Sequence, residues 1–108
     1  MEGKGKKALY TIEKIDDKIE GEEWKPFPED SQYLISNYGR VKNPKGGIMP
    51  GYSHRGYIRT RIGKLGQLPN HRLVMLTFKP IKNPDDYVVD HINGIKSDNR
   101  LSNLRWVF

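Results

Sequence analysis

The chain has 108 residues, which is enough for one domain and too short for two well-formed cores. Hydrophobic residues make up 35% of it and charged residues 30%, so we expect a small hydrophobic core that needs a metal or a partner for added stability. The absence of cysteine excludes disulfide bridges and thiolate zinc sites, and no apolar run approaches the roughly 20 residues of a transmembrane helix.

The charge is distributed unevenly along the chain. Residues 1–23 carry five Lys and seven Asp or Glu, whereas residues 24–108 carry fourteen Lys or Arg and six Asp or Glu. The resulting +8 on residues 24–108 predicts a polyanionic partner, either nucleic acid or an anionic membrane. Basic residues alternate with tyrosines instead of gathering on an amphipathic helix, which favours nucleic acid. On charge alone, a basic domain without such a partner is the alternative.

The first 22 residues are predicted to form a flexible, charged tail. The opening MEGKGKKALYTIEK carries positive charge without a long apolar segment behind it, so it is not expected to be a secretory signal. The stretch YTIEKIDDKIEGEE mixes charges and has sparse apolar positions, so weak order is expected there.

From Trp24 onward the sequence predicts short strands separated by turns. Two prolines in WKPFPED oppose a helix and favour an extended segment. Alternation in SQYLIS predicts a strand, followed by a turn over residues 37–39 and a returning strand over residues 40–42. A second turn is expected over residues 43–47.

The segment GYIRTRIG predicts another strand, with two unlike faces. Its apolar or neutral face would hold Ile58, Thr60 and Ile62. Its other face would present Tyr57, Arg59 and Arg61 to the outside.

One helix is expected after this strand. Residues 63–70 are predicted to be a loop, because a glycine and a proline interrupt them. HRLVMLTF then predicts a helix over residues 71–78, with Asn70 as its N-cap and Pro80 ending it. Two short strands are expected to follow, one over residues 87–89 and one within SNLRWV, joined by a long polar connection.

Asp90 and His91 stand side by side where the first of these two strands ends. Asp is a hard oxygen ligand suited to Mg²⁺, and His can take a proton from water near pH 7. Neighbouring strand residues point to opposite faces, so both can serve one site only if the strand ends or bends there. The sequence Ile92-Asn93-Gly94 predicts such a bend. A surface turn in which Asp90 caps the loop is the alternative.

The longer pattern resembles a known family. DHINGIKSDNRLSNLRWV, preceded by HRLVMLTF, resembles the HNH (His-Me finger) nucleases of the phage and intron homing-endonuclease type. WKPFPEDSQYLISNYGRVKN and GYIRTRIG resemble the NUMOD4 DNA-binding module that often precedes this motif. The resemblance implies an α+β fold with three parts: a tail over 1–22, a β-rich DNA-binding module over 23–69, and a ββα-metal motif over 70–108.

The resemblance also implies roles for individual residues. His91 would be the general base, Asp90 a ligand of Mg²⁺ or Mn²⁺, and Asn103 the residue that braces the loop and orients the histidine. Arg105 would lie near the scissile phosphate, whereas Leu104 and Trp106 would fill the small core.

The family's third element, a His or Asn on a helix after the second strand, falls beyond Phe108, so the last helix is expected to be cut short. Three explanations stay open: a shortened piece of a longer protein, a naturally short protein that binds DNA without cutting, or a ligand borrowed from elsewhere in the chain. Of the other histidines, His71 is expected to pack in the helix and His54 to lie near a phosphate.

The basic face would lie in a groove of double-stranded DNA. Contacts with phosphates or bases are expected from Arg40, Lys42, Arg55, Tyr57, Arg59, Arg61, Lys64 and Arg72.

Two functions from different classes follow. The first is a metal-dependent endonuclease that nicks double-stranded DNA, or cuts both strands as a dimer; the second is a catalytically impaired DNA-binding remnant of such an enzyme. Either would act as a monomer or weak homodimer, without a membrane, inside a bacterial host, encoded by a phage or an intron.

Overall fold

The computed structural model describes residues 18–108, which form three small antiparallel sheets around one helix. The first sheet has the strand order β1-β2-β3-β4. Its strands are β1 (Trp24–Phe27), β2 (Asp30–Ser36), β3 (Val41–Lys42) and β4 (Ile48–Met49). The predicted strands and turns of this region are confirmed, and Gly39 takes the positive φ of +87° that its turn requires.

The second sheet has the order β5-β6-β7, with β5 at Tyr52–His54, β6 at Tyr57–Arg61 and β7 at Gln67–Pro69. The two unlike faces of β6 are confirmed, because Thr60 is buried and Arg61 is exposed.

The loop prediction for residues 63–70 is wrong in part. Gly63–Leu65 form a short 3₁₀ turn (η1), and Gln67–Pro69 pair with β6. A proline is tolerated there because β7 lies at the edge of its sheet, where the missing N–H faces away from the ladder.

The helix α2 runs over Asn70–Phe78, as HRLVMLTF predicts. The predicted N-cap is wrong, since Pro69 is the cap and Asn70 is already helical. The Asn70 side chain turns inward: its Nδ2 donates to the Gly39 carbonyl at 3.1 Å and its Oδ1 accepts from the Thr60 hydroxyl at 2.7 Å. It therefore joins the helix to both sheets.

The third sheet is a hairpin of β8 (Val88–His91) and β9 (Leu104–Val107), which pair in register from Val88 with Val107 to His91 with Leu104. Two 3₁₀ turns, η2 (Pro84–Asp86) and η3 (Leu101–Asn103), precede β8 and β9. The two predicted strands and their long polar connection are confirmed.

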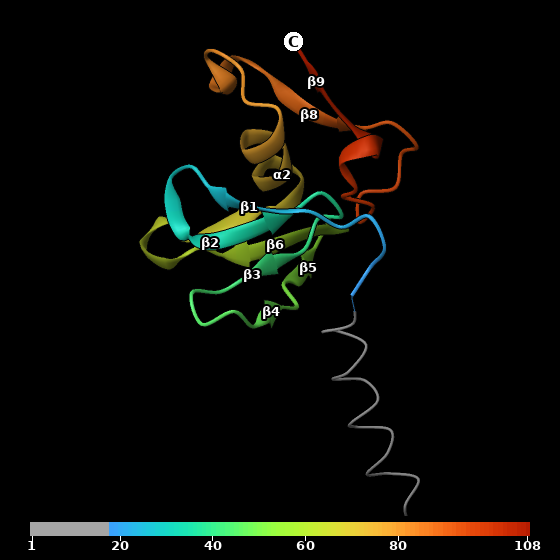
Figure 1. Cartoon of the computed structure of the whole chain (residues 1–108). Helices are drawn as coiled ribbons and strands as arrows, with labels where there is room; N and C mark the ends of the chain where they lie inside the picture. Colours follow the sequence, from blue (N-terminus) through green and yellow to red (C-terminus); the bar gives the residue numbers. More distant parts are fainter. Residues whose placement is uncertain (1–17) are drawn as a thin grey trace, which may run out of the picture.

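Helix α2 lies between this hairpin and the other two sheets (Figure 1). It contacts strands of all three sheets, and its buried face supplies the middle of a single core. The buried hydrophobic residues of that core are Phe27, Ile35, Val41, Ile62, Leu73, Val74, Met75 and Leu104. No helix described between residues 18 and 108 has the length and apolar character needed to cross a membrane.

The end of the predicted tail contacts the first sheet. Glu22 forms an ion pair with Arg40 at 2.6 Å, and the Gly21 carbonyl accepts a bond from Asn37. Burial alone would raise the pKa of Glu22, but hydrogen bonds from Arg40 and Ser36 lower it below its usual value. Residues 1–17 of the predicted tail lie outside the described residues.

Removing one methylene from a fully buried side chain should test this core. Ile35→Val removes one methylene from a side chain with no exposed surface, and should lower the free energy of unfolding by about 1 kcal/mol. Urea unfolding measures the change. Ile95→Val makes the same chemical change on a side chain that is 54% exposed, and should shift stability by less than about 0.5 kcal/mol. Equal losses in both variants would contradict the assignment of the core.

Candidate functional site

His91 is the last residue of β8, and the strand ends where the sequence predicts a bend. The Gly94 N–H donates to the His91 carbonyl at 2.9 Å, which closes a turn immediately after the strand. Only 9% of His91 is exposed, because its strand partner Leu104 and the helix α2 lie against it. The histidine is therefore held in the interior at the start of the polar loop.

The His91 ring has one direct hydrogen-bond partner among the described residues, Asn99. His91 Nε2 lies 2.8 Å from Asn99 Oδ1, and Asn99 is 5% exposed. An amide oxygen can only accept, so Nε2 carries a hydrogen, and in the neutral ring Nδ1 keeps its lone pair. This arrangement gives His91 the ring nitrogen that a general base needs.

Two aromatic side chains surround His91. The His71 ring, from α2, lies edge-on with its centroid 4.9 Å from that of His91. The Tyr57 ring, from β6, lies 6.0 Å from His91 and 5.3 Å from His71. The outward face of the second sheet therefore leads directly to the histidine of the third.

His71 is held in its neutral form. Burial is the main cause that lowers the pKa of His71 to about 4, and the nearby charges of His91, Arg72 and Arg59 lower it further. Its Nδ1 is buried without a hydrogen-bond partner among the described residues. The prediction that His71 packs in the helix is confirmed, although it packs against His91 as well.

Asn103 braces the loop after β8. Its Nδ2 donates to Asn93 Oδ1 and to the Asp98 carbonyl, both at 2.9 Å, and its Oδ1 accepts from the Asn93 N–H at 3.0 Å. Arg100 donates two bonds to Asp98, which hold the pKa of that carboxyl far below its usual range. Side chains thus fix a loop that has no regular secondary structure.

The resemblance implies that Asn103 braces the loop and orients the histidine, and the side chain bonded directly to the His91 ring is that of Asn99. His71 and Tyr57 were likewise not predicted as neighbours of His91. No spacing rule brings Asn99 to His91 across an irregular loop of this kind. The DNRLSN pattern marks both asparagines as loop residues without separating their partners.

Asp90 lies on the exposed side of the hairpin. Arg105, its strand partner, donates from Nε to Asp90 Oδ2 at 2.9 Å, and the Asp90 side chain is 42% exposed. An exposed carboxylate is suitable as one oxygen ligand of Mg²⁺. Among residues 18–108, no three His, Asp or Glu side chains gather into a metal-binding group.

The predicted DNA-contacting residues fall into two sets. Four are exposed around the second sheet: Arg55, Tyr57, Arg61 and Lys64. The other four are only partly exposed, and each has a partner within the chain. Arg40 pairs with Glu22 and Arg72 with Asp85, Lys42 lies over the Trp24 ring, and Arg59 donates to the Gln67 carbonyl.

Comparison with known proteins agrees with this geometry. The family model of the HNH endonuclease matches residues 69–107, and that of the NUMOD4 motif matches residues 22–68. An uncharacterised HNH endonuclease of Acanthamoeba polyphaga mimivirus is 41% identical over 92 residues, covering 78% of this chain and 23% of the relative. The DNA endonuclease I-HmuI of Bacillus phage SP01 is 36% identical over 93 residues, covering 79% of this chain and 52% of the relative.

A solved structure, of DNA binding and cleavage by the HNH homing endonuclease I-HmuI, is also similar. It has a TM-score of 0.65 and 34% sequence identity, and the match covers 79% of this chain and 52% of that one. The chain thus spans about a quarter of the length of the mimivirus relative and about half of the length of I-HmuI.

A β-hairpin that ends in a buried histidine, packed on a helix behind a basic sheet, is the architecture of an HNH nuclease unit with an accessory module. The chain belongs to the HNH endonuclease family and carries a NUMOD4 motif ahead of its HNH motif. Within the family it resembles the homing type, and the predicted α+β fold is confirmed.

The depressed pKa of His71 predicts acid sensitivity. The unfolded chain protonates this histidine near pH 6.5 and the folded chain only near pH 4, so folding should lose stability as the pH falls between these values. Urea unfolding at several pH values measures the slope. His71→Gln keeps a neutral polar side chain and should flatten the slope in this window. An unchanged slope in His71→Gln would show that another group carries it.

Proposed function

We propose that this protein is a metal-dependent DNA endonuclease that hydrolyses phosphodiester bonds in double-stranded DNA. The observation that carries the proposal is His91, buried at the end of β8 with Nε2 bonded to Asn99 and Nδ1 left able to accept a proton. The similarity to HNH endonucleases, including one that binds and cleaves DNA, supports this chemistry.

In the proposed reaction, His91 Nδ1 takes a proton from the attacking water. The Asp90 carboxylate would hold a divalent ion, Mg²⁺ or Mn²⁺, with phosphate oxygens and waters as further ligands. When bound, such an ion stabilises the charge on the leaving oxygen. Asn103 would keep the loop in place through its bonds to Asn93 and Asp98, and Arg105 would attract the phosphate.

One histidine base activates one water, and that water attacks one strand, so we propose that a single chain nicks DNA. A double-strand break would require two copies. The phage origin of one relative supports an intracellular setting in a bacterial host.

The ion pair of Asp90 with Arg105 favours a second candidate function. A metal at Asp90 has to compete with a guanidinium that already occupies one carboxylate oxygen. If the guanidinium prevails, the chain binds DNA without cutting it. The binding surface would then be the exposed basic set around the second sheet.

Replacement of the base separates these candidates. His91→Ala should lower the rate of plasmid nicking in Mg²⁺ or Mn²⁺ by about 100- to 10,000-fold, because general-base catalysis contributes that much. Agarose gels that resolve supercoiled from open-circular plasmid measure the rate. Ser102→Ala changes an exposed residue near the same loop and should nick normally. Undiminished nicking by His91→Ala would refute the role of the base, and no nicking by the unaltered chain would favour the DNA-binding candidate.

The salt dependence of binding tests the basic surface. Six or more phosphate contacts should weaken the affinity for duplex DNA on the order of 1,000-fold between about 50 and about 200 mM salt. Arg61→Gln removes an exposed cation of β6 and should lower the slope of log K against log salt by about 1. Fluorescence anisotropy measures both quantities. Lys82→Gln, an exposed cation outside the sheets, should leave the slope unchanged, and a slope that is flat for every protein would contradict this surface.

A further inference from the structure

We propose that the turn over residues 37–39 of the NUMOD4 part positions the His91 ring by supporting Asn99, so that this part belongs to the catalytic unit as well as to the DNA-binding surface. The inference rests on the proposed role of His91 as base. It assigns Asn99 and Gly39 as positioning residues.

The first link is between Asn99 and His91. Asn99 Oδ1 lies 2.8 Å from His91 Nε2, and both residues are buried. The aromatic contacts with Tyr57 and His71 restrict where the ring can lie, but they do not choose between its two nitrogens. The amide oxygen of Asn99 makes that choice, so a displaced Asn99 would release the ring nitrogen that must stay protonated.

The second link is between Asn99 and Gly39. A Cβ at position 39 would lie 2.6 Å from the Asn99 Cβ and 2.8 Å from the Asn99 carbonyl oxygen. These distances are far inside van der Waals contact, so the two backbones meet with no room for a side chain at position 39. The turn also gives Gly39 a φ of +87°, which glycine adopts without strain. The sequence from 37 to 39 is therefore fitted to the segment that carries Asn99.

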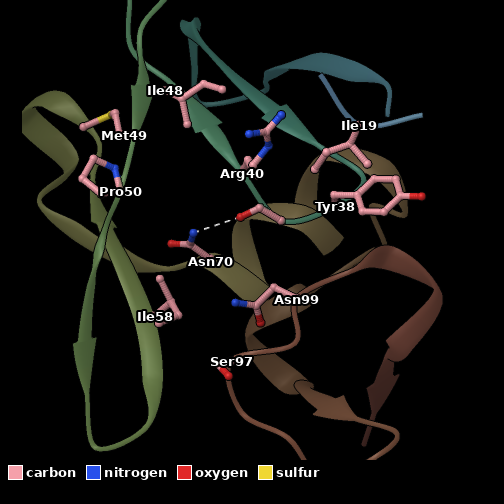
Figure 2. A pocket seen from close by; sticks show the side chains of 11 residues that line it. Ile19, Tyr38, Arg40, Ile48, Met49, Pro50, Ile58, Asn70, Ser97 and Asn99 are labelled. Carbon is pink, nitrogen blue, oxygen red and sulfur yellow. Dashed lines mark hydrogen bonds between the residues drawn. The ribbon is translucent and has the colours of Figure 1, made fainter. Parts of the chain in front are cut away.

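The third link is a set of hydrogen bonds that hold the turn over residues 37–39 in place. The Leu101 N–H donates to the Asn37 carbonyl at 2.8 Å, which ties the far side of the loop to the same turn. Asn70 donates to the Gly39 carbonyl at 3.1 Å, the bond drawn as a dashed line in Figure 2. The Asn70 side chain also accepts a hydrogen bond from the Thr60 hydroxyl. The turn thus cannot shift without disturbing α2 and β6.

A cavity of about 450 Å³ lies beside this junction and is lined from both parts of the chain (Figure 2). Asn70, Asn99, Ser97 and Tyr38 line it together with the apolar Ile58 and Met49. Asn99 and Tyr38 therefore border one hollow that both parts of the chain share.

Two glycines with similar backbones separate positioning from general strain. Gly39→Ala should reduce kcat for plasmid nicking on the order of 100-fold, the penalty expected for a displaced catalytic group, with DNA affinity changed less than about twofold. Gly46 has a φ of +91° but open space where its Cβ would lie, so Gly46→Ala introduces the same backbone strain without a clash. It should nick DNA normally. Equal effects of the two substitutions on kcat, or a loss of affinity that accounts for the lower rate, would overturn the proposal.

A second pair of variants tests the acceptor on Asn99. Asn99→Asp keeps an oxygen beside Nε2 and should retain most of the turnover, whereas Asn99→Leu keeps the volume but offers no acceptor and should lose it. Thermal unfolding establishes that both chains are folded. If Asn99→Leu nicks as fast as Asn99→Asp, the hydrogen bond does not position the base.

Nitrogen-15 NMR of the histidine rings gives a readout that needs neither DNA nor metal. In the unaltered 108-residue chain, neutral His91 should carry its proton on Nε2, and Gly39→Ala but not Gly46→Ala should shift it toward a mixture of tautomers. If the Nε2–H tautomer is absent from the unaltered chain, this inference fails even when His91→Ala abolishes nicking. If the tautomer shifts as expected but the unaltered chain does not nick, the proposed endonuclease function fails while the positioning contact stands.

Discussion

Burial of one face of α2 against all three sheets is the packing on which the rest of the structure depends. The sheets have only two to four short strands, and the two-stranded hairpin in particular needs to pack against a helix to be stable in water. Leu73, Val74 and Met75 supply the apolar surface that the sheets share, and β9 joins the same core through Leu104. The HNH hairpin and the NUMOD4 strands therefore stabilise each other through the helix, which explains how a chain with so few hydrophobic residues can bury a continuous core.

The periodic parts of the chain could be predicted from sequence. Buried positions recur at every second residue of a strand and at every third or fourth residue of a helix. Alternation identified β6 and its buried Thr60, and HRLVMLTF identified α2. The strand at Gln67–Pro69 was missed because three residues with a proline carry no period, and only its pairing with β6 makes it a strand. The strand preference of these three residues is weaker than the loop preference that the nearby glycine and proline indicate.

The candidate site was predictable to a lesser degree, for a related reason. Asp90 and His91 could be found because they stand at the end of a predicted strand, and Asn103 because the resemblance to the HNH motif assigns it a role. The contacts of His91 with Asn99, His71 and Tyr57 arise from three separate segments that meet only after the sheets have packed on α2. Spacing along the chain contains no information about such meetings. Family resemblance supplied the role of the base, while the residues that hold it could be read only from the structure.

The basic side chains divide into those paired within the protein and those exposed on its surface. Arg40 and Arg72 form ion pairs with carboxylates of the chain, and Asp98 is paired with Arg100 within the polar loop. Such cations act mainly on the protein's own conformation, because a phosphate would have to displace a carboxylate to reach them. Arg55, Arg61 and Lys64 remain exposed around β6, the strand whose Tyr57 reaches the His91 ring. A polyanion drawn to these side chains would lie across the second sheet, and the same surface continues to the histidine. Recognition and chemistry can therefore share one face of the molecule, provided that the interior contacts keep the ring in its orientation.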